Sequence, residues 1–216
     1  AELVGTYLAA HTTPRDFEGR PDDYLDQVLD PSVFSTIKSE KLADFCDVFC
    51  ETTAFDVRRS RRVIEAGKRA GLKPKLHAEM GASRLAAEVG AISADHLEKI
   101  DDGGIALMKE RGCVAVLLPA CSFFLGVGQA PARRIMDANL PVAVATDYNP
   151  GSSMVESLPL TLSIAATQMR TTPTELVVAA TANAAAALSR HDRLGAVEAG
   201  MQADLIILDV PNHNQW

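Results

Sequence analysis

The sequence has no excess of positive charge, because 28 Asp and Glu residues outnumber 21 Lys and Arg residues and leave a net charge of −7. A nucleic-acid-binding surface needs a clustered basic patch, so this balance argues against such a partner. The densest basic stretch is RRSRR at residues 58–62, at the start of a helical pattern. We interpret it as a solvated helix face.

Long apolar runs are also lacking. No stretch approaches the ~18 consecutive apolar residues that indicate a membrane span. The N-terminal segment AELVGTYLAAH carries no basic region of the signal-peptide type and reads as a strand that begins in mid-protein. We therefore expect a cytoplasmic protein that is not bound to a membrane.

Cysteine is sparse: Cys46, Cys50, Cys113 and Cys121 are scattered, without the spacing of a disulfide framework. This usage fits a reducing compartment. Cys46 and Cys50 are four residues apart, which places them on one face of an extended strand. A metal could bind there, but two buried strand thiols are the favoured interpretation.

Short apolar runs alternate with amphipathic segments along most of the chain. The runs are rich in Val, Ile, Leu or Phe and carry few charges before their C-terminal ends, which is typical of strands buried on both faces of a parallel sheet. They cover residues 3–11, 45–51, 75–79, 91–97, 114–120 and 141–147.

Helical patterns fill the intervals between these runs, at residues 55–70, 101–111, 130–138 and 157–169. Gly71 and Gly112 follow the first two and predict their C-terminal ends. Thr172, Pro173 and Glu175 then give a capping signal for a further Ala-rich helix.

About six successive strand–helix units predict an α/β fold with a parallel sheet, of which the (β/α)8 TIM-type barrel is the closed form. Residues 1–190 would form a partial barrel corresponding to strands 3 to 8, and we expect the chain to be incomplete at its N-terminus. Residues 191–216 contain two short strand patterns around a Gly turn and predict part of a small β-sandwich.

Polar residues end most of the predicted strands. His11, His77, His96 and Asp147 each close an apolar run, and Glu51 closes another. In such a barrel the carboxyl ends of the strands face the active site. Imidazole and carboxylate are natural ligands of a zinc-like divalent ion, and a carboxylate beside the activated water can accept its proton. The pattern predicts metal-assisted hydrolysis without naming a substrate.

The segment TDYNPGSS, residues 146–153, follows the last predicted strand. Asn149, Gly151 and Ser152 would lie in a tight loop and offer an amide, a free backbone N–H and a hydroxyl to an anionic, amide-like substrate. The alternative is an ordinary Asn-Pro-Gly turn.

Several motifs resemble those of the imidazolonepropionases, a family of amidohydrolases. They are YLAAHTTP, GRPDDYLD, LADFCDVFCE, KLHAE, GAISADHLE, VAVLLPA, VATDYNPGSS and AGMQADLIILD, which together run from about Leu3 to Asp209. GRPDDY and ATDYNPGSS are the most specific. The resemblance implies hydrolysis of 4-imidazolone-5-propanoate to N-formimidoyl-L-glutamate, with one zinc or iron ion.

The resemblance also implies roles for the strand-end residues. His77 matches the metal ligand of the fifth barrel strand, and Asp147 matches that of the eighth and the proton acceptor for the attacking water. His96 is similar to the histidine that polarises the substrate carbonyl or orients the water, and His11 to a substrate-contacting histidine. The residues that match the substrate-holding loop are Asn149, Gly151 and Ser152.

Two features depart from the family pattern. The sequence has no His-x-His pair, which supplies two metal ligands from the first strand in the family, so the chain alone is expected to bind metal poorly. Met80 stands where family members carry a Glu or Gln that contacts the substrate. We do not assign this role to the neighbouring Glu79.

Two alternatives remain at this stage. A deaminase of a nucleobase or an aminoimidazole predicts the same three residues, His77, His96 and Asp147. A catalytically incomplete fragment, acting as a binding module, would keep these residues without a function. The expected partner is a small-molecule substrate, and members of the family are commonly dimers, which makes a homodimer a further expectation.

Overall fold

The computed structural model describes residues 2–51, 53–78 and 82–212. In this part of the chain a six-stranded parallel sheet has its strands in sequence order, with β1 and β6 at its edges. This topology confirms the predicted succession of strand–helix units. The strands are β1 (Thr6–Ala10), β2 (Phe45–Cys50), β3 (Lys73–Ala78), β4 (Ser93–His96), β5 (Val114–Leu117) and β6 (Val142–Val144).

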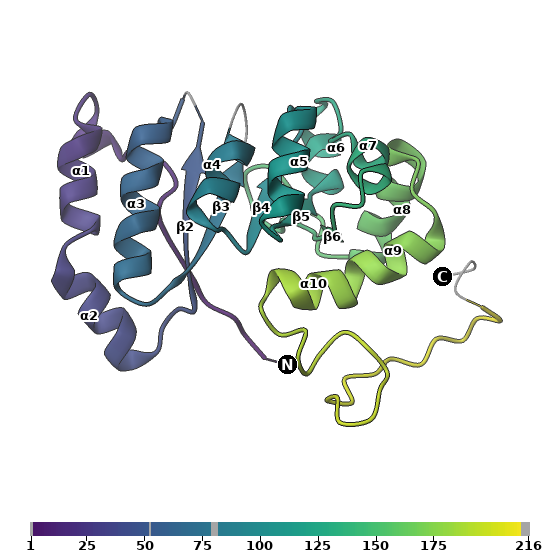
Figure 1. The fold of residues 1–216 in the computed structure, drawn as a ribbon. Helices are drawn as coiled ribbons and strands as arrows, with labels where there is room; N and C mark the ends of the chain where they lie inside the picture. The colour runs from purple at the N-terminus through teal and green to yellow at the C-terminus, as the bar shows by residue number, and fades with distance from the viewer. Residues whose placement is uncertain (1, 52, 79–81, 213–216) are drawn as a thin grey trace.

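Helices connect the strands, and α3, α4 and α5 pack side by side along the sheet (Figure 1). In the described residues they are a 3-10 turn η1 (Arg15–Phe17), α1 (Pro21–Val28), α2 (Pro31–Glu40), α3 (Val57–Arg69), α4 (Ala82–Val89), α5 (Asp102–Glu110), α6 (Pro119–Leu125), α7 (Ala132–Asp137), α8 (Leu158–Met169), α9 (Pro173–Ala180) and α10 (Ala182–Ala187).

The predicted helix boundaries agree with the local chemistry. Thr172 and Glu175 form a complete capping box at the start of α9. Gly71 and Gly112 follow α3 and α5 with φ of +91° and +68°, a conformation that side chains with a Cβ disfavour. The glycine stops predicted for these two helices are therefore confirmed.

The helix-facing side of β2 shows how closely the layers pack. Cys46 is fully buried against α3, and a Cβ added to Gly67 would lie 2.4 Å from the Cβ of Cys46. All four cysteines are buried and free. The interpretation of Cys46 and Cys50 as buried strand thiols is confirmed.

The basic run of α3 is only partly a solvated face. Arg59, with 24% of its side chain exposed, donates from Nε and Nη2 to the two carboxylate oxygens of Asp22 at 3.1 and 2.7 Å. Arg58 and Arg62 also approach Asp22, which belongs to the GRPDDY motif. In the same motif the Tyr24 hydroxyl donates to the carbonyl of Ala9 at 2.7 Å. The motif thus connects α1 to α3 through ion pairs and to β1 through a hydrogen bond.

Most of the predicted strands are shorter in the structure, and the local chemistry explains two of these differences. The run at residues 114–120 ends as a strand at Leu117 because Pro119 begins α6. The run at residues 91–97 ends at His96, whose φ of 74° is incompatible with a strand.

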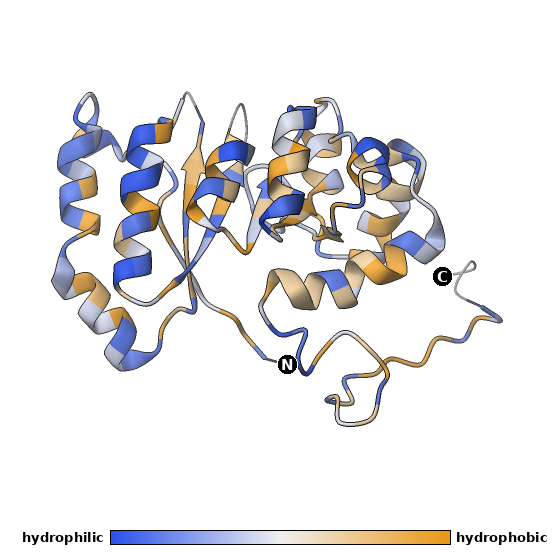
Figure 2. Cartoon of the chain, in the orientation of Figure 1, coloured by the Kyte–Doolittle hydropathy of each residue, from blue (hydrophilic) through white to orange (hydrophobic). Residues whose placement is uncertain are grey.

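The β-sandwich strands expected near the C-terminus are not formed: residues 191–212 contain no strand. Figure 1 shows this tail as an extended segment, and Figure 2 shows its hydrophobic stretch standing clear of the sheet. Ile206 and Ile207 are 78% and 99% exposed. An isolated strand has no partner for its backbone N–H and C=O groups, so the apolar pattern alone does not produce a sheet.

The longest helix in the described part of the chain, α3, has 13 residues. Crossing a bilayer takes about 20 apolar residues, and no helix of the described residues meets both the length and the hydropathy that this requires.

Candidate metal centre and active site

Strand register brings polar residues into neighbouring positions at the carboxyl ends of β2, β3 and β4. Phe49 pairs with His77, His77 pairs with Asp95, and Ala78 pairs with His96. Side chains alternate between the two faces of a strand, so those of neighbouring strands at paired positions project to the same face. The side chains of His77 and Asp95 therefore project to one face. His96 pairs with Ala78, one position further on, and its φ of 74° departs from strand geometry at the end of β4.

The three histidines predicted from the strand ends lie together. The ring centroids of His77 and His96 are 5.4 Å apart, and those of His11 and His77 are 6.3 Å apart. His11 also stacks on Phe49 at 5.4 Å. The charge of Asp147 acts on all three imidazoles. The three histidines, which come from separate strand ends, thus converge at one rim, whereas Asp147 is not a member of the group of described residues that could hold a metal ion.

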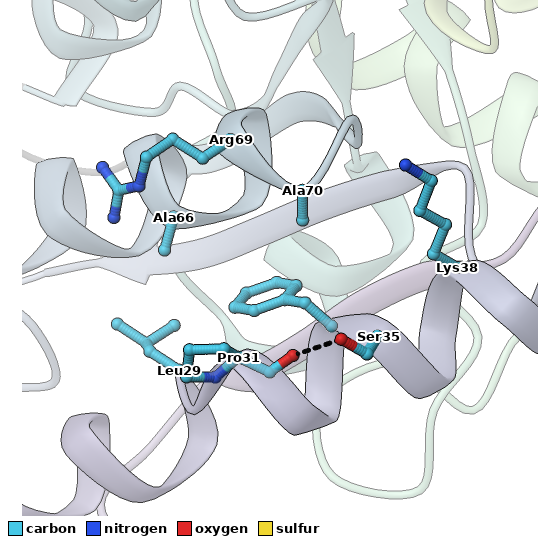
Figure 3. A pocket seen from close by; sticks show the side chains of 8 residues that line it. Leu29, Pro31, Ser35, Lys38, Ala66, Arg69 and Ala70 are labelled. Atoms are coloured by element: carbon cyan, nitrogen blue, oxygen red, sulfur yellow. Dashed lines mark hydrogen bonds between the residues drawn. The ribbon is translucent and has the colours of Figure 1, made fainter.

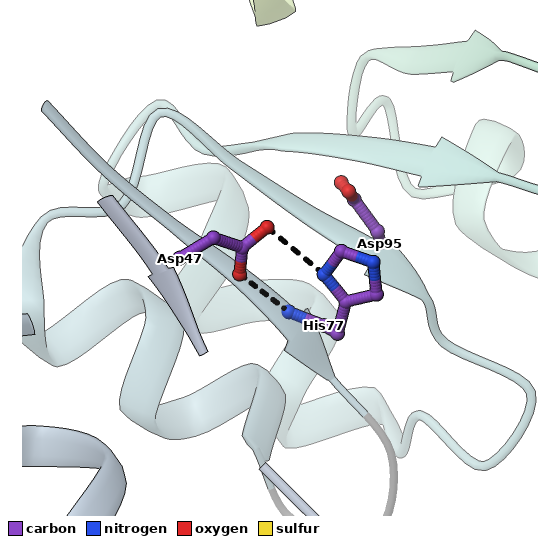
Figure 4. Close-up of side chains that lie close together, drawn as sticks. All are labelled: Asp47, His77 and Asp95. Carbon is purple, nitrogen blue, oxygen red and sulfur yellow. Dashed lines mark hydrogen bonds and ion pairs between the residues drawn. The ribbon is translucent and has the colours of Figure 1, made fainter. Parts of the chain in front are cut away.

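His77 is held by a buried carboxylate that the sequence reasoning did not single out. Nδ1 of His77 lies 2.9 Å from Oδ2 of Asp47, and the backbone N–H of His77 donates to Oδ1 at 3.1 Å (Figure 4). Asp47 is 2% exposed. A histidine that binds metal usually donates its other ring N–H to such a carboxylate. The contact therefore leaves Nε2 as the nitrogen directed to an ion.

The pKa values of this group follow from burial and charge. Burial lowers the pKa of His77, but the carboxylate of Asp47, with smaller contributions from Asp95 and Asp147, outweighs it and raises the pKa to about 9. Burial raises the pKa of Asp95, against the opposing charges of Lys75 and His77. The carboxylates around His77 thus favour a positive charge at the position of its ring.

Asp47, His77 and Asp95 form a group that can hold a metal ion. Each offers one ligand atom, and these atoms all lie within 4.8 Å of one another. Asp95 faces the imidazole of His77 (Figure 4). Both oxygens of Asp47 are already engaged by His77, so the donors left for an ion are Nε2 of His77 and the carboxylate of Asp95, which suit zinc or iron by ligand type. The donor set fits a divalent ion at the carboxyl ends of the strands.

The backbone is strained at two of the predicted reactive residues. His96 and Leu97 have φ of 74° and 67°, and Asp147 has φ of 52°. Non-glycine residues rarely adopt this left-handed region, which costs roughly 1–3 kcal/mol each and is concentrated at functional sites. The same conformation occurs at Lys41, Asn139, Arg170 and Ser189. At the ends of β4 and β6 it therefore marks sharp turns of the backbone at the predicted reactive residues.

The loop after β6 is closed by its own hydrogen bonds. Oδ1 of Asn149 accepts from the backbone N–H groups of Gly151 and Ser152, both at 2.8 Å, and Nδ2 donates to the carbonyl of Asp147 at 2.7 Å. The free N–H expected at Gly151 is therefore wrong for this structure, because the Asn149 side chain folds back over the turn. The same contacts anchor the backbone of Asp147.

Asp47 and Asp95 were missed because they lie inside strands and do not end them. The available signal was a charged residue within an otherwise apolar run, as in FCDVFC and SADH. Buried carboxylates are rare without a partner, which makes such a residue informative. Met80, at which the sequence departs from the family pattern, and its neighbour Glu79 lie outside the described residues.

A separate pocket lies between α2 and α3 (Figure 3). Its walls come from Leu29, Phe34 and Ala66, with the long side chains of Lys38 and Arg69 at its rim. None of the histidines above lines it, so it is unrelated to the polar strand ends.

A parallel α/β sheet whose carboxyl ends gather histidines and aspartates is the arrangement expected of a barrel-type metal-dependent hydrolase. The sequence agrees, since the model of the Amidohydrolase family matches residues 56–215. The chain belongs to this family.

Among curated relatives, the chain is 46% identical over 215 residues to an imidazolonepropionase of Caldanaerobacter subterraneus subsp. tengcongensis, covering 98% of this chain and 52% of the relative. It is 48% identical over 218 residues to an imidazolonepropionase of Geobacillus kaustophilus, covering 99% of this chain and 51% of the relative. The chain thus spans about half the length of the curated relatives it matches.

Solved structures agree on the fold. A zinc-bound adenosine deaminase from Xanthomonas campestris aligns with a TM-score of 0.67 at 20% identity, over 92% of this chain and 50% of that one. A mutant atrazine chlorohydrolase from Arthrobacter aurescens, complexed with zinc and atraton, aligns with a TM-score of 0.69 at 18% identity, over 93% of this chain and 52% of that one. Six parallel strands with intervening helices are therefore part of a TIM-type barrel.

Proposed function

We propose that this chain is the part of an imidazolonepropionase that carries strands 3 to 8 of the barrel, at residues 1–190, followed by the segment 191–216. The reaction is the hydrolysis of 4-imidazolone-5-propanoate to N-formimidoyl-L-glutamate. The observation that supports it best is the gathering of His11, His77 and His96 at one rim, where the charge of Asp147 also acts on the imidazoles. The identity to imidazolonepropionases, over nearly all of this chain, supports the choice of substrate.

One divalent ion, zinc or iron, would be held by His77 and Asp147. When bound, it lowers the pKa of a water molecule and polarises the carbonyl under attack. Asp47 keeps the His77 ring oriented through Nδ1. Asp95 lies close enough to His77 to complete the donor set.

The chain's own residues supply the remaining steps. Asp147 accepts a proton from the attacking water, and His96 polarises the carbonyl or orients the water. His11, stacked on Phe49, contacts the substrate. The loop formed by Asn149, Gly151 and Ser152 is closed by its own hydrogen bonds and fixes the backbone of Asp147. A cytoplasmic location and a homodimer belong to the same proposal.

A second candidate is a deaminase in the same family, because a zinc-bound adenosine deaminase has the same fold. The residues His77, His96 and Asp147 serve both reactions. The NPGSS loop and the GRPDDY motif favour imidazolone hydrolysis.

A direct assay separates the two candidates. The zinc- and iron-supplemented chain is offered 4-imidazolone-5-propanoate, cytosine, guanine and adenosine, beside Asp147→Asn as the inactive control. Turnover of the imidazolone that is abolished in Asp147→Asn supports the proposal. Turnover of a base without turnover of the imidazolone refutes it, and no turnover of any substrate favours a catalytically incomplete chain.

A further inference from the structure

Glu98 and Ser122 form a buried pair beside His96. Oε1 of Glu98 lies 3.8 Å from Nδ1 of His96, and the hydroxyl of Ser122 donates to the same oxygen at 2.8 Å. The side chains of His96 and Glu98 are 14% and 12% exposed, and Ser122, on α6, is 1% exposed. A carboxylate from one element, fixed by a hydroxyl from another, thus faces a ring of the candidate active site.

Burial of the second carboxylate oxygen of Glu98 costs free energy of folding. Oε2 is buried and has no hydrogen-bond partner among the described residues. Leaving a buried carboxylate oxygen without a partner costs about 1–3 kcal/mol or more. Such a group calls for an explanation other than stability.

The backbone brings His96 and Glu98 together. His96 and Leu97 both adopt positive φ, and Leu97 is 1% exposed within the hydrophobic core. With Leu97 anchored in this way, the chain turns at the end of β4, and the side chains of His96 and Glu98 lie next to each other. The positive φ values of His96 and Leu97 thus place the carboxylate of Glu98 beside the His96 ring.

The charges around the pair keep Glu98 ionised. Burial raises its pKa, but the His96 ring and the Ser122 hydroxyl outweigh burial, and the net pKa is lowered. An ionised carboxylate can only accept a hydrogen bond, so the ring nitrogen that faces it must carry a proton. His77, Asp95 and Asp147 are the other charged groups that act on His96.

We propose that Glu98, fixed by Ser122, positions His96 for the reaction by holding the imidazole as the Nδ1–H tautomer, so that the unprotonated Nε2 accepts a hydrogen bond from the attacking water and orients it. The 3.8 Å separation is longer than a hydrogen bond, so the carboxylate acts on the ring through its charge. Glu98 is a positioning residue that acts through His96. The catalytic part of the inference rests on the proposed function, whereas the tautomer does not.

The tautomer is measured by the ring nitrogen-15 shifts of His96 in the metal-free chain, with EDTA present and above the pKa of the ring. The signal is assigned by its loss in His96→Gln. The wild type is expected to show the Nδ1–H form. In Glu98→Gln the population moves toward the Nε2–H form, which is favoured in water, and Glu98→Asp restores part of the Nδ1–H form.

Glu88→Gln is the matched control, because Glu88 is exposed and pairs with Arg61 on the surface. It must leave the His96 spectrum unchanged. Ser122→Ala removes the hydroxyl without touching the ring and gives an intermediate population, which also serves if Glu98→Gln does not fold. A wild type in the Nε2–H form, or the same tautomer in all folded variants, overturns the proposal.

Activity provides a separate readout. Glu98→Gln is expected to lower kcat by about 10- to 100-fold and to leave KM within about twofold, since the imidazole that orients the water is no longer held in place and substrate contacts are kept. A tautomer shift in a chain without imidazolone turnover upholds the positioning role and refutes the proposed function. Turnover of the imidazolone without a tautomer shift upholds the proposed function and refutes the positioning role of Glu98.

Discussion

Nδ1 of His77 lies 2.9 Å from the buried carboxylate of Asp47, and the same carboxylate accepts the backbone N–H of His77. Two hydrogen bonds from one residue fix both the position of the strand and the rotation of the ring. A preoriented imidazole loses less freedom when it binds an ion, because its Nε2 is already directed outward.

The first prediction concerns this contact. Asp47→Asn keeps the size of the side chain but removes its charge, so the ring is held less firmly and is a weaker base. We expect zinc affinity to fall by about 10- to 100-fold, as for other carboxylates that support a metal-binding histidine. Competition with a coloured chelator measures the change. The matched control is Asp192→Asn at an exposed position, and equal affinities in the two variants would contradict the assigned role.

The second prediction concerns packing between β2 and α3. Gly67→Ala places a Cβ 2.4 Å from the Cβ and 2.6 Å from the sulfur of Cys46. Overpacking of this kind costs about 1–3 kcal/mol in the free energy of unfolding, measured by urea denaturation. Gly128→Ala is the control, since its Cβ meets no atom within 4 Å. A Gly67→Ala protein as stable as Gly128→Ala would show that the layers are less closely packed.

The third prediction concerns the start of α9. Thr172→Ala removes the side chain that accepts from the backbone N–H of Glu175, and a lost N-cap costs about 1 kcal/mol. Thr172→Ser keeps the hydroxyl and is expected to cost less. Thermal and urea unfolding of the two variants provide the comparison, and equal stability would mean that the capping box contributes nothing measurable.

The same capping box predicts a pH dependence. The backbone N–H of Thr172, together with Arg133, holds the pKa of Glu175 below its ordinary value of 4.5. A lowered folded-state pKa stabilises the fold above pH 4.5, and this contribution is lost as pH falls through the folded-state pKa. Glu175→Gln is therefore less stable than wild type at neutral pH, and the difference shrinks in acid. A difference that grows in acid would contradict the sign.

The fourth prediction concerns the thiols. Burial raises the pKa of Cys46 and Cys113 to about 12 and that of Cys121 to about 11, and it also raises the pKa of Cys50. Because the thiolate is the reactive form, the native protein should react with Ellman's reagent very slowly at pH 8, and all 4 thiols should react once it is unfolded. Rapid reaction of the native chain would mean that a thiol is accessible.

The sequence predicted the parallel sheet and three converging histidines because both follow from local rules. Apolar runs alternate with helical patterns, and polar residues such as His77 and His96 stand where the runs end. Asp47 could not be assigned in this way, since its meaning depends on the register that pairs β2 with β3. Register is a property of the folded sheet and is not written in either strand alone.

Two other expectations failed for the same reason. The loop after β6 contains the expected Asn149 and Gly151, but their polar groups bond to each other, which composition does not reveal. The tail has strand-like residues at 205–208 and forms no strand, because strand formation requires a partner within reach. In both cases the residue types indicated which groups could form hydrogen bonds, but the sequence did not predict which groups they would bond to.

The central claim is that residues from separate strand ends hold one metal ion. Crystals of the chain grown with zinc, measured at the zinc absorption edge, locate the ion directly in an anomalous difference map. The account predicts a peak about 2.0–2.2 Å from Nε2 of His77 and from a carboxylate oxygen of Asp147. A zinc ion bound elsewhere, or one whose ligands include neither residue, would contradict it.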